Sequence, residues 1–414
     1  MKQHDFIRNP IATGAAIGLI FLLAGCRQAG IPHSDYAASP VDIEIVRKGE
    51  SLVGKGPSAF SVDGHFMWGA SVLKSEEDGK YYMVYSAPEA GEHPFDNAWV
   101  YGSKMGLAVS DRPDGGFRQL GFFLNTDGFT PDTSSWDAQT VMNPHLRRFG
   151  DKYYLYYVGG RDAGYLPVKA KGGTLDRRSR IQQMLRIGVI GFDSFAGLLK
   201  GDFTKSETPL LSPRTRVKPD DIVNPSPEGT VPKPDNIIVV NPSVVYRPSD
   251  GKYLLYFKGN LYDPHWRGVH GVALADSPAG PFVPLDTVVF DLPSTDGRKL
   301  SAEDPYVWYN RNDRLFYAVF KDFTGHFTRS GPCLAILYSE DGIDWKLPQN
   351  SLFMKKELVL ASGDTVKVHR LERPQLLLDE NDDPQVLYSA CSVEDVNGKY
   401  DGSSFNIQIP LKKR

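Results

Sequence analysis

The sequence predicts an all-β protein folded as a five-bladed β-propeller, and three observations support this prediction. Short apolar runs bounded by Gly, Asp, Asn and Pro dominate the chain, while long apolar stripes of helical period are scarce. A turn followed by a strand recurs, most clearly at 78–85 (DGKYYMVY), 150–157 (GDKYYLYY) and 250–257 (DGKYLLYF). Similar short strands precede and follow each copy in the same order, which is typical of a repeat architecture.

The first residues are expected to be an export signal and a tether rather than part of the fold. Residues 1–25 combine positive charges with an apolar run at 11–23 and end in Leu-Ala-Gly before Cys26, which resembles a bacterial lipobox. Cleavage there would leave Cys26 as a lipidated N-terminus, anchored to a membrane without spanning it. We therefore expect a lipid-anchored protein of the bacterial cell envelope, with residues 26–40 as a tether and 41–414 as the propeller.

Each of the five units is expected to contribute one innermost strand near the propeller axis. These strands begin with the residue pairs at 69–70, 143–144, 241–242, 304–305 and 373–374, and the last four pairs end in proline. Proline is tolerated at the first residue of a strand, where its missing N–H breaks no ladder. The segment 42–62 is expected to supply the outermost strand that closes the ring with the last unit. A single large sandwich is the alternative, but it does not explain the constant order of the repeated pieces.

The leading ends of the innermost strands should converge, and their polar side chains predict a sugar site. Glycoside hydrolysis needs one carboxylic acid and one carboxylate, and we assign Asp137 as the base and Glu303 as the acid, with Asp304 tuning or orienting them. The predicted substrate-binding residues are Trp68, Asn143, His145, Asn241, Glu372 and Arg373.

Several of these assignments have alternatives that the sequence leaves open. Glu372 and Arg373 form either an internal ion pair or a clamp on an acidic sugar. His145 is a hydroxyl binder, a proton donor or a structural residue, and Trp68 packs between blades or against a sugar face. Adjacent residues on an extended strand point in opposite directions, so at most one of Glu303 and Asp304 is expected to face the substrate squarely.

The repeats, the polar residues before proline and the Ser-Pro-Ala-Gly-Pro-Phe turn at 277–282 resemble the five-bladed β-propeller glycoside hydrolases. That group includes family 43, family 117 and the invertase-like enzymes, and the resemblance covers about residues 63–410. It implies a propeller with a central active site. The family-43 pattern places carboxylates on the first three inner strands, whereas this chain has Gly69 on the first and Asn241 on the third. The family triad is therefore not carried over to this chain.

Composition excludes several other classes of partner and cofactor. The formal net charge is −3 and the pI is near 6.3, which argues against nucleic acid as a partner. No glycine-rich phosphate loop follows a strand, so no nucleotide is expected. Cys333 and Cys391 fall in apolar runs and are expected to be buried free thiols. No spacing of ligands indicates a metal, and a structural calcium in the channel stays open as an alternative.

The leading hypothesis is therefore a glycoside hydrolase acting on plant or algal polysaccharides or their oligosaccharides. A propeller that binds glycans without cleaving them is the second hypothesis. An inverting glycoside phosphorylase is the third, and it would need Arg373, Lys258 or Lys321 to bind phosphate. Linkage, sugar and stereochemistry do not follow from the sequence.

Overall fold

The computed structural model describes residues 35–124, 134–162, 164, 176–214, 233–262, 266–292, 301–325 and 328–414. The expected export signal and Cys26 lie outside these residues. Among the described helices, none is long and apolar enough to cross a membrane.

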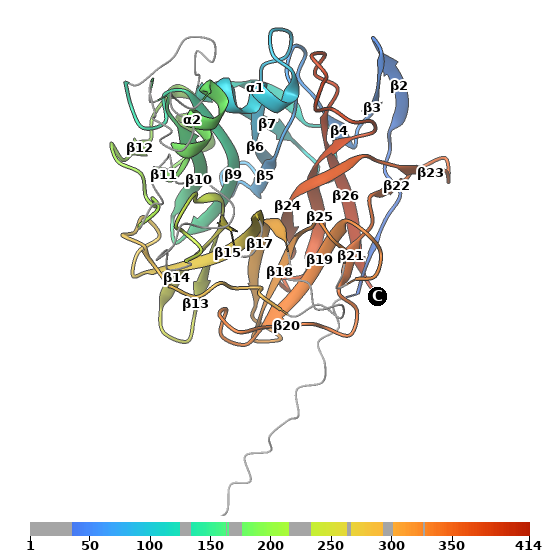
Figure 1. Cartoon of the computed structure of the whole chain (residues 1–414). Helices are drawn as coiled ribbons and strands as arrows, with labels where there is room; N and C mark the ends of the chain where they lie inside the picture. Colours follow the sequence, from blue (N-terminus) through green and yellow to red (C-terminus); the bar gives the residue numbers. More distant parts are fainter. Residues whose placement is uncertain are drawn as a thin grey trace, which may run out of the picture. The chain divides into compact units, whose positions relative to one another are not determined.

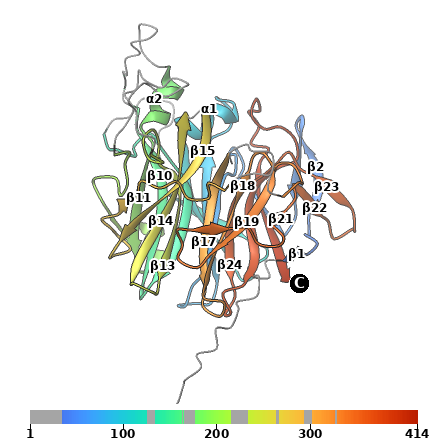
Figure 2. The same ribbon diagram turned by 60° about the horizontal axis from the view of Figure 1, so that its bottom comes forward.

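Five antiparallel sheets lie around a central axis and form the predicted five-bladed propeller (Figures 1 and 2). The first blade is β5 (Ala70–Lys74), β6 (Tyr81–Pro88), β7 (Ser103–Ser110) and β8 (Arg118–Leu124). The second is β9 (Thr140–Phe149), β10 (Lys152–Gly160), β11 (Arg186–Phe192) and β12 (Thr204–Lys205). The third is β13 (Val240–Arg247), β14 (Lys252–Tyr262), β15 (Trp266–Ala275) and β16 (Val283–Pro284).

The fourth blade is β17 (Ala302–Asn310), β18 (Leu315–Asp322), β19 (Cys333–Ser339) and β20 (Trp345–Lys346), with β21 (Leu352–Met354) also pairing with β19. The fifth is β24 (Arg370–Leu378), β25 (Pro384–Ser392) and β26 (Phe405–Lys413). Two hairpins stand apart from the blades, β2 (Glu44–Lys48) with β3 (Ser51–Lys55) and β22 (Glu357–Val359) with β23 (Thr365–Lys367).

Two N-terminal strands complete the fifth blade by pairing with β26. One is β4 (Ala59–Phe60), which lies within the segment 42–62 that was expected to close the ring. The other is β1 (Tyr36–Ala38), which pairs with Leu411–Lys413. Because β1 falls inside the range predicted as a tether, the folded sheet begins before residue 41. The tether contains few large apolar residues, and a three-residue edge strand needs little side-chain burial.

The hydrophobic core is divided into layers between neighbouring blades. One buried cluster joins the first and second blades, and equivalent clusters join each following pair around the ring to the fifth and first. Trp308 is fully buried between the fourth and fifth blades. A single sheet cannot bury both of its faces, so the stacked blades supply the core that each lacks alone. Cys333 and Cys391 are buried and unpaired, as predicted.

Tyrosines on the second strands tie neighbouring blades together through buried hydroxyls. Tyr156 donates to the carbonyl of Pro278 in the third blade, and Tyr256 donates to that of Gly342 in the fourth. Tyr388 of the last blade donates to the carbonyl of Pro113 in the first. The recurrent Tyr in the second strand of the repeat thus has a structural cause, because a buried hydroxyl needs a partner.

Every innermost strand contains or adjoins a residue with a left-handed backbone. The φ angles are 79° at Gly69, 57° at Asn143, 56° at Asn241, 62° at Asp304 and 57° at Arg373. In the last four blades the left-handed residue and the following proline together face one residue of the next strand, which is a β-bulge. The prolines were predicted at the first residues of the strands, but they lie at bulges inside the strands. At a bulge the ladder does not require an N–H from the proline.

In the part of the chain that the structure describes, three short helices accompany the blades: α1 (Phe95–Tyr101), α2 (Arg177–Gln183) and α3 (Phe195–Lys200). The helices α1 and α2 contact each other at one end of the sheets (Figures 1 and 2). This is the end at which the bulges of the inner strands meet, and α1 and α2 form walls above them.

Candidate functional site

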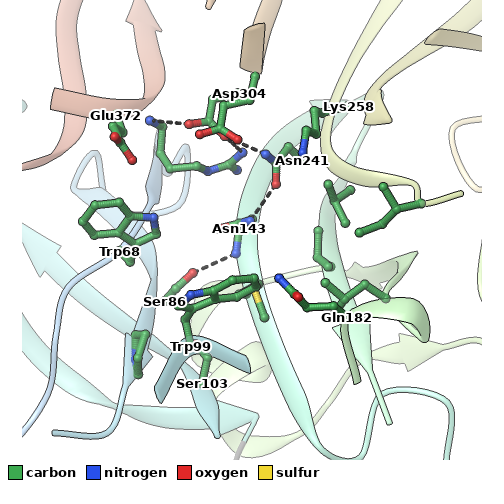
Figure 3. Close-up of a pocket in the computed structure, with 18 of the residues that line it drawn as sticks. Trp68, Ser86, Trp99, Ser103, Asn143, Gln182, Asn241, Lys258, Asp304 and Glu372 are labelled. Carbon is green, nitrogen blue, oxygen red and sulfur yellow. Dashed lines mark hydrogen bonds and ion pairs between the residues drawn. The ribbon is translucent and has the colours of Figure 1, made fainter. Parts of the chain in front are cut away.

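A cavity of about 390 Å³ lies at the hub, above the bulges of the inner strands. Figure 3 shows Asn143 near its centre, Asp304 and Glu372 toward one end, and Trp99 and Ser103 toward the other. The structure thus brings together most of the predicted site residues. Those that line the cavity are Trp68, Asn143, Asn241, Glu303, Asp304, Glu372 and Arg373.

The left-handed residues form a chain of hydrogen bonds across the floor of the cavity (Figure 3). The Nδ2 atom of Asn143 donates to Oδ1 of Asn241 at 2.7 Å, and Nδ2 of Asn241 donates to Oδ1 of Asp304 at 2.6 Å. Nη1 of Arg373 donates to the same Asp304 oxygen at 3.0 Å, and the Arg373 backbone N–H donates to Oδ2 at 3.1 Å. Strained backbone of this kind costs about 1–3 kcal/mol per residue and clusters at functional sites.

Both Glu303 and Asp304 line the cavity, although an extended strand would point them apart. The bulge at Asp304 and Pro305 interrupts the alternation of β17 and explains the difference from the prediction. Glu303 has the more accessible side chain, with 22% of it exposed against 3% for Asp304. Glu303 is therefore the carboxylate best placed to meet a ligand.

Lys321 holds two carboxylates of neighbouring blades together. Its ammonium donates to Oε1 of Glu303 at 3.0 Å and also to Oε1 of Glu372. Arg370 donates a further hydrogen bond to Glu372 at 3.3 Å. Carboxylate oxygens of Glu303, Asp304 and Glu372 all lie within 4.8 Å of one another, a closeness that these cations and Arg373 make tolerable.

The two adjacent carboxyls have pKa values displaced in opposite directions. Burial raises the pKa of Asp304 to about 6, and the charge of Glu303 adds to this against the opposing pull of Arg373. Burial acts on Glu303 in the same sense, but Lys321 and Lys258 outweigh it and hold the Glu303 pKa below its ordinary value. Near neutral pH, Glu303 is thus the ionised group and Asp304 the one that exchanges a proton. Glu303 was predicted as the acid, and the directions of these two pKa values favour Asp304 for that role.

The three carboxylates resemble a metal site only in their composition. Lys321, Arg370 and Arg373 supply one cation for each carboxylate, and the Lys321 ammonium already binds two of them. A divalent ion would have to displace that ammonium, so we assign no metal to the cluster.

Asp137 does not line this cavity, which corrects its predicted role as the base. Both of its oxygens bind Lys205 of β12, at 3.0 and 2.9 Å. Its carboxylate also accepts hydrogen bonds from Ser135 and from the hydroxyl of Tyr157. Asp137 precedes β9, and its side chain contacts β12, the outermost strand of the second blade, instead of the hub. Asp137 is therefore buried and forms a structural ion pair with Lys205.

His145 also lies away from the cavity, beneath the hub. Its ring nitrogens contact Oε1 of Gln375 at 3.0 Å and the carbonyl of Val244 at 3.3 Å. Burial and the charge of Arg147 lower the His145 pKa to about 3. A neutral, enclosed imidazole does not donate a proton to a substrate, so its role as a hydroxyl binder or acid is corrected to a structural one.

The helices α1 and α2 supply a wall of the cavity that was not predicted from the sequence. Trp99 of α1 and the α2 residues Arg178 and Gln182 line the cavity. The α2 helix is held by Asp162, which is fully buried and accepts hydrogen bonds from Arg180 and Arg177. The charged run at 177–180 could have indicated such a helix, but nothing in it places the helix over the hub.

No family model matches the chain. An extracellular endo-α-(1→5)-L-arabinanase 2 of Bacillus subtilis (strain 168) is 34% identical over 103 residues. That match covers 23% of this chain and 20% of the arabinanase, so the chain matches about a fifth of the relative's length.

Solved structures of other proteins are similar in fold to this chain over most of its length. A family 117 glycoside hydrolase of the marine bacterium Zobellia galactanivorans has a TM-score of 0.53 at 14% identity, covering 91% of this chain and 90% of its own. An N-acetylgalactosamine deacetylase from F. plautii, in complex with blood group B trisaccharide, has a TM-score of 0.50 at 12% identity, with 89% and 95% covered. At these identities the likeness establishes architecture only. The chain therefore has the five-bladed β-propeller fold of these carbohydrate-active enzymes, as its resemblance to the propeller glycoside hydrolases predicted.

Proposed function

We propose that this protein is a glycoside hydrolase that cleaves plant or algal polysaccharides or their oligosaccharides in the hub cavity. The observation that carries the proposal is the pair of adjacent carboxyls with oppositely displaced pKa values, Glu303 and Asp304, in a cavity edged by Trp68 and Trp99. Carboxylates accept hydrogen bonds from sugar hydroxyls, and an indole packs against the C–H face of a sugar ring.

The roles follow from protonation and exposure. Asp304, with a pKa of about 6, holds the proton that the leaving oxygen needs. Glu303 is ionised and partly exposed, and it attacks the anomeric carbon or activates water. Lys321 on the adjacent strand β18 holds Glu303 in position and also binds Glu372 of the next blade.

The separation of the carboxylates favours retention of configuration. One oxygen of Glu303 and one of Asp304 lie within 4.8 Å of each other, closer to the roughly 5–5.5 Å of a retaining pair than to the roughly 6.5–9.5 Å of an inverting pair. Besides Glu303, Asp304 and Glu372, the carboxylate of Asp96 on α1 also lines the cavity. Inverted products would point to Asp96 in place of the Glu303–Asp304 pair.

The test is a screen of the purified protein against polysaccharides and aryl glycosides, read as new reducing ends or released phenol. We expect turnover that falls by at least about 10³-fold in Glu303→Gln, since it removes a reacting group, while Asp137→Asn keeps it. Full activity of Glu303→Gln would refute the assignment. Glycan binding without any cleavage would instead support a propeller that only binds sugars.

A phosphorylase is the second candidate, and one observation favours it. The ammonium of Lys258 lies in the cavity and donates to the neutral Oδ1 of Asn260 at 3.1 Å, with no carboxylate hydrogen-bonded to it among the described residues. Such a cation suits a phosphate oxygen. Activity that requires added inorganic phosphate would decide for this candidate.

We further propose that lipidation of Cys26 anchors the enzyme in the bacterial cell envelope. Cys26→Ala should move the protein from the membrane to the soluble fraction. Unchanged fractionation would refute the anchor.

A further inference from the structure

The five left-handed positions around the hub carry four side chains and one glycine. Asn143, Asn241, Asp304 and Arg373 occupy four positions, and Gly69 occupies the fifth. A Cβ atom built on Gly69 would lie 3.4 Å from Nε of Arg373 and 3.6 Å from Oδ1 of Asn143. The point beside Gly69 is therefore flanked by a donor and an acceptor at little more than hydrogen-bond distance.

The polar atoms that face this point have no partner elsewhere. Within the described residues, Nε and Nη2 of Arg373 and Oδ1 of Asn143 make no hydrogen bond. The two residues are only 3% and 9% exposed. Their other side-chain atoms are used, since Nη1 of Arg373 binds Asp304 and Nδ2 of Asn143 binds Asn241. A buried polar atom without a hydrogen-bond partner lowers the stability of a protein. Three such atoms on two neighbouring residues therefore indicate a site for a ligand group.

The donor and acceptor pattern selects the kind of group that fits. Nε–H and one N–H of Nη2 lie on the same edge of the planar guanidinium, so Arg373 offers two donors side by side. Asn143 offers an acceptor. A hydroxyl group accepts the first two and donates to the third. A carboxylate or sulfate would match Arg373 but would set its lone pairs against Oδ1 of Asn143, and a cation would meet the charge of Arg373.

We propose that Gly69, Arg373 and Asn143 form a subsite for one hydroxyl group of a sugar bound in the cavity. The proposal deepens the proposed function, on which it rests for the sugar. Trp68, the neighbour of Gly69, lines the same cavity and supplies an apolar face beside the subsite. A sugar lacking that hydroxyl leaves the guanidinium edge and the amide oxygen unpaired, so the subsite selects for the hydroxyl by about 100-fold.

The first test uses two glycines that differ only in their surroundings. Gly69→Ala places a methyl group between Arg373 and Asn143. Gly79→Ala is the matched control, because Gly79 has a φ of 70° and a Cβ there meets nothing within 4 Å. Both variants carry the same left-handed strain. The probes are methyl α-L-arabinofuranoside and methyl β-D-galactopyranoside, titrated by calorimetry. We expect at least a 10-fold loss of affinity in Gly69→Ala and less than a twofold change in Gly79→Ala.

The second test keeps the proposal falsifiable if Gly69→Ala does not fold. The wild-type protein is titrated with each monodeoxy derivative of the probe that binds. One position should cost about 100-fold and the others about 10-fold or less, and Gly69→Ala should bind that one derivative as tightly as Gly79→Ala does. Equal losses at all positions, no binding of either probe, or an ordered water that stays beside Gly69 in a sugar complex would each overturn the subsite.

Failure of the subsite proposal and failure of the proposed hydrolase function give different results in these tests. Cleavage without discrimination among the deoxy sugars removes the subsite and leaves the hydrolase. Discrimination in binding without any new reducing ends leaves the subsite and removes the hydrolase.

Discussion

Replacing Asp304 by Asn should destabilise the protein strongly at pH 7 and still more at pH 5. Asp304 and Arg373 each have 3% of the side chain exposed and are joined at 3.0 Å. All three partners of the Asp304 carboxylate are donors, namely Asn241, the Arg373 guanidinium and the Arg373 backbone N–H. An amide sets its own NH2 group against one of these donors in either orientation. Losing the charge partner of a buried Arg costs about 3–5 kcal/mol.

The pH dependence follows from the pKa of Asp304, which burial and the charge of Glu303 raise to about 6. A carboxyl group whose pKa is raised in the folded protein contributes its full stabilisation below the ordinary pKa of Asp. This contribution is lost as the pH rises through about 6. At pH 5 most Asp304 is protonated in the folded wild type but ionised in the unfolded chain, so the wild type gains stability that Asn at this position cannot gain. The free energy of unfolding of Asp304→Asn should therefore fall further below the wild-type value, by about 1 kcal/mol, as the pH falls from 7 to 5.

Urea denaturation of the two proteins at both pH values measures this difference. The double variant Asp304→Asn/Arg373→Met is the control, because removing both charges leaves no uncompensated ion, and it should be less destabilised than the sum of the single variants. A cost below about 1 kcal/mol at pH 7, or additive single effects, would show that the pair is not buried and coupled as described.

The remaining predictions concern the site and its walls. Asp137→Asn should lower the free energy of unfolding by about 1–3 kcal/mol yet leave kcat/KM within about twofold, and a large loss of kcat/KM at unchanged stability would contradict its structural role. Asp162→Asn should release the α2 wall and raise KM with little change in kcat; a fall in kcat alone would be inconsistent with this. Because Asp304 must be protonated to donate, kcat/KM should fall about tenfold per pH unit above about pH 6, and a rate that rises there would exclude it as the acid.

The propeller could be predicted from the sequence because its physical cause is local and repeated. Each Asp-Gly or Asn-Asp turn fixes a hairpin, and each following strand repeats an aromatic pattern. Five weak signals in one order reinforce each other. The strand β1 gave no such signal, because it consists of only three residues, and its partner β26 lies at the other end of the chain.

The site was predicted only where the repeat itself places residues. The residues before proline reach the hub in the last four blades, so Asn143, Asn241, Asp304 and Arg373 were found together with Glu303. Asp137 was misplaced because it lies outside the repeat, where spacing says nothing of direction. The protonation states of Glu303 and Asp304 depend on Lys321 from the adjacent strand and on a bulge, and neither can be read from adjacency in the sequence.

The most direct test of the central claim is cleavage by the hub carboxylates. Wild-type protein, Glu303→Gln and Asp137→Asn should be incubated with the same polysaccharide panel, with and without phosphate, and new reducing ends counted. We predict cleavage by the wild type and by Asp137→Asn, and none by Glu303→Gln in a protein that still unfolds cooperatively. Equal cleavage by Glu303→Gln and the wild type would contradict a catalytic site at the hub.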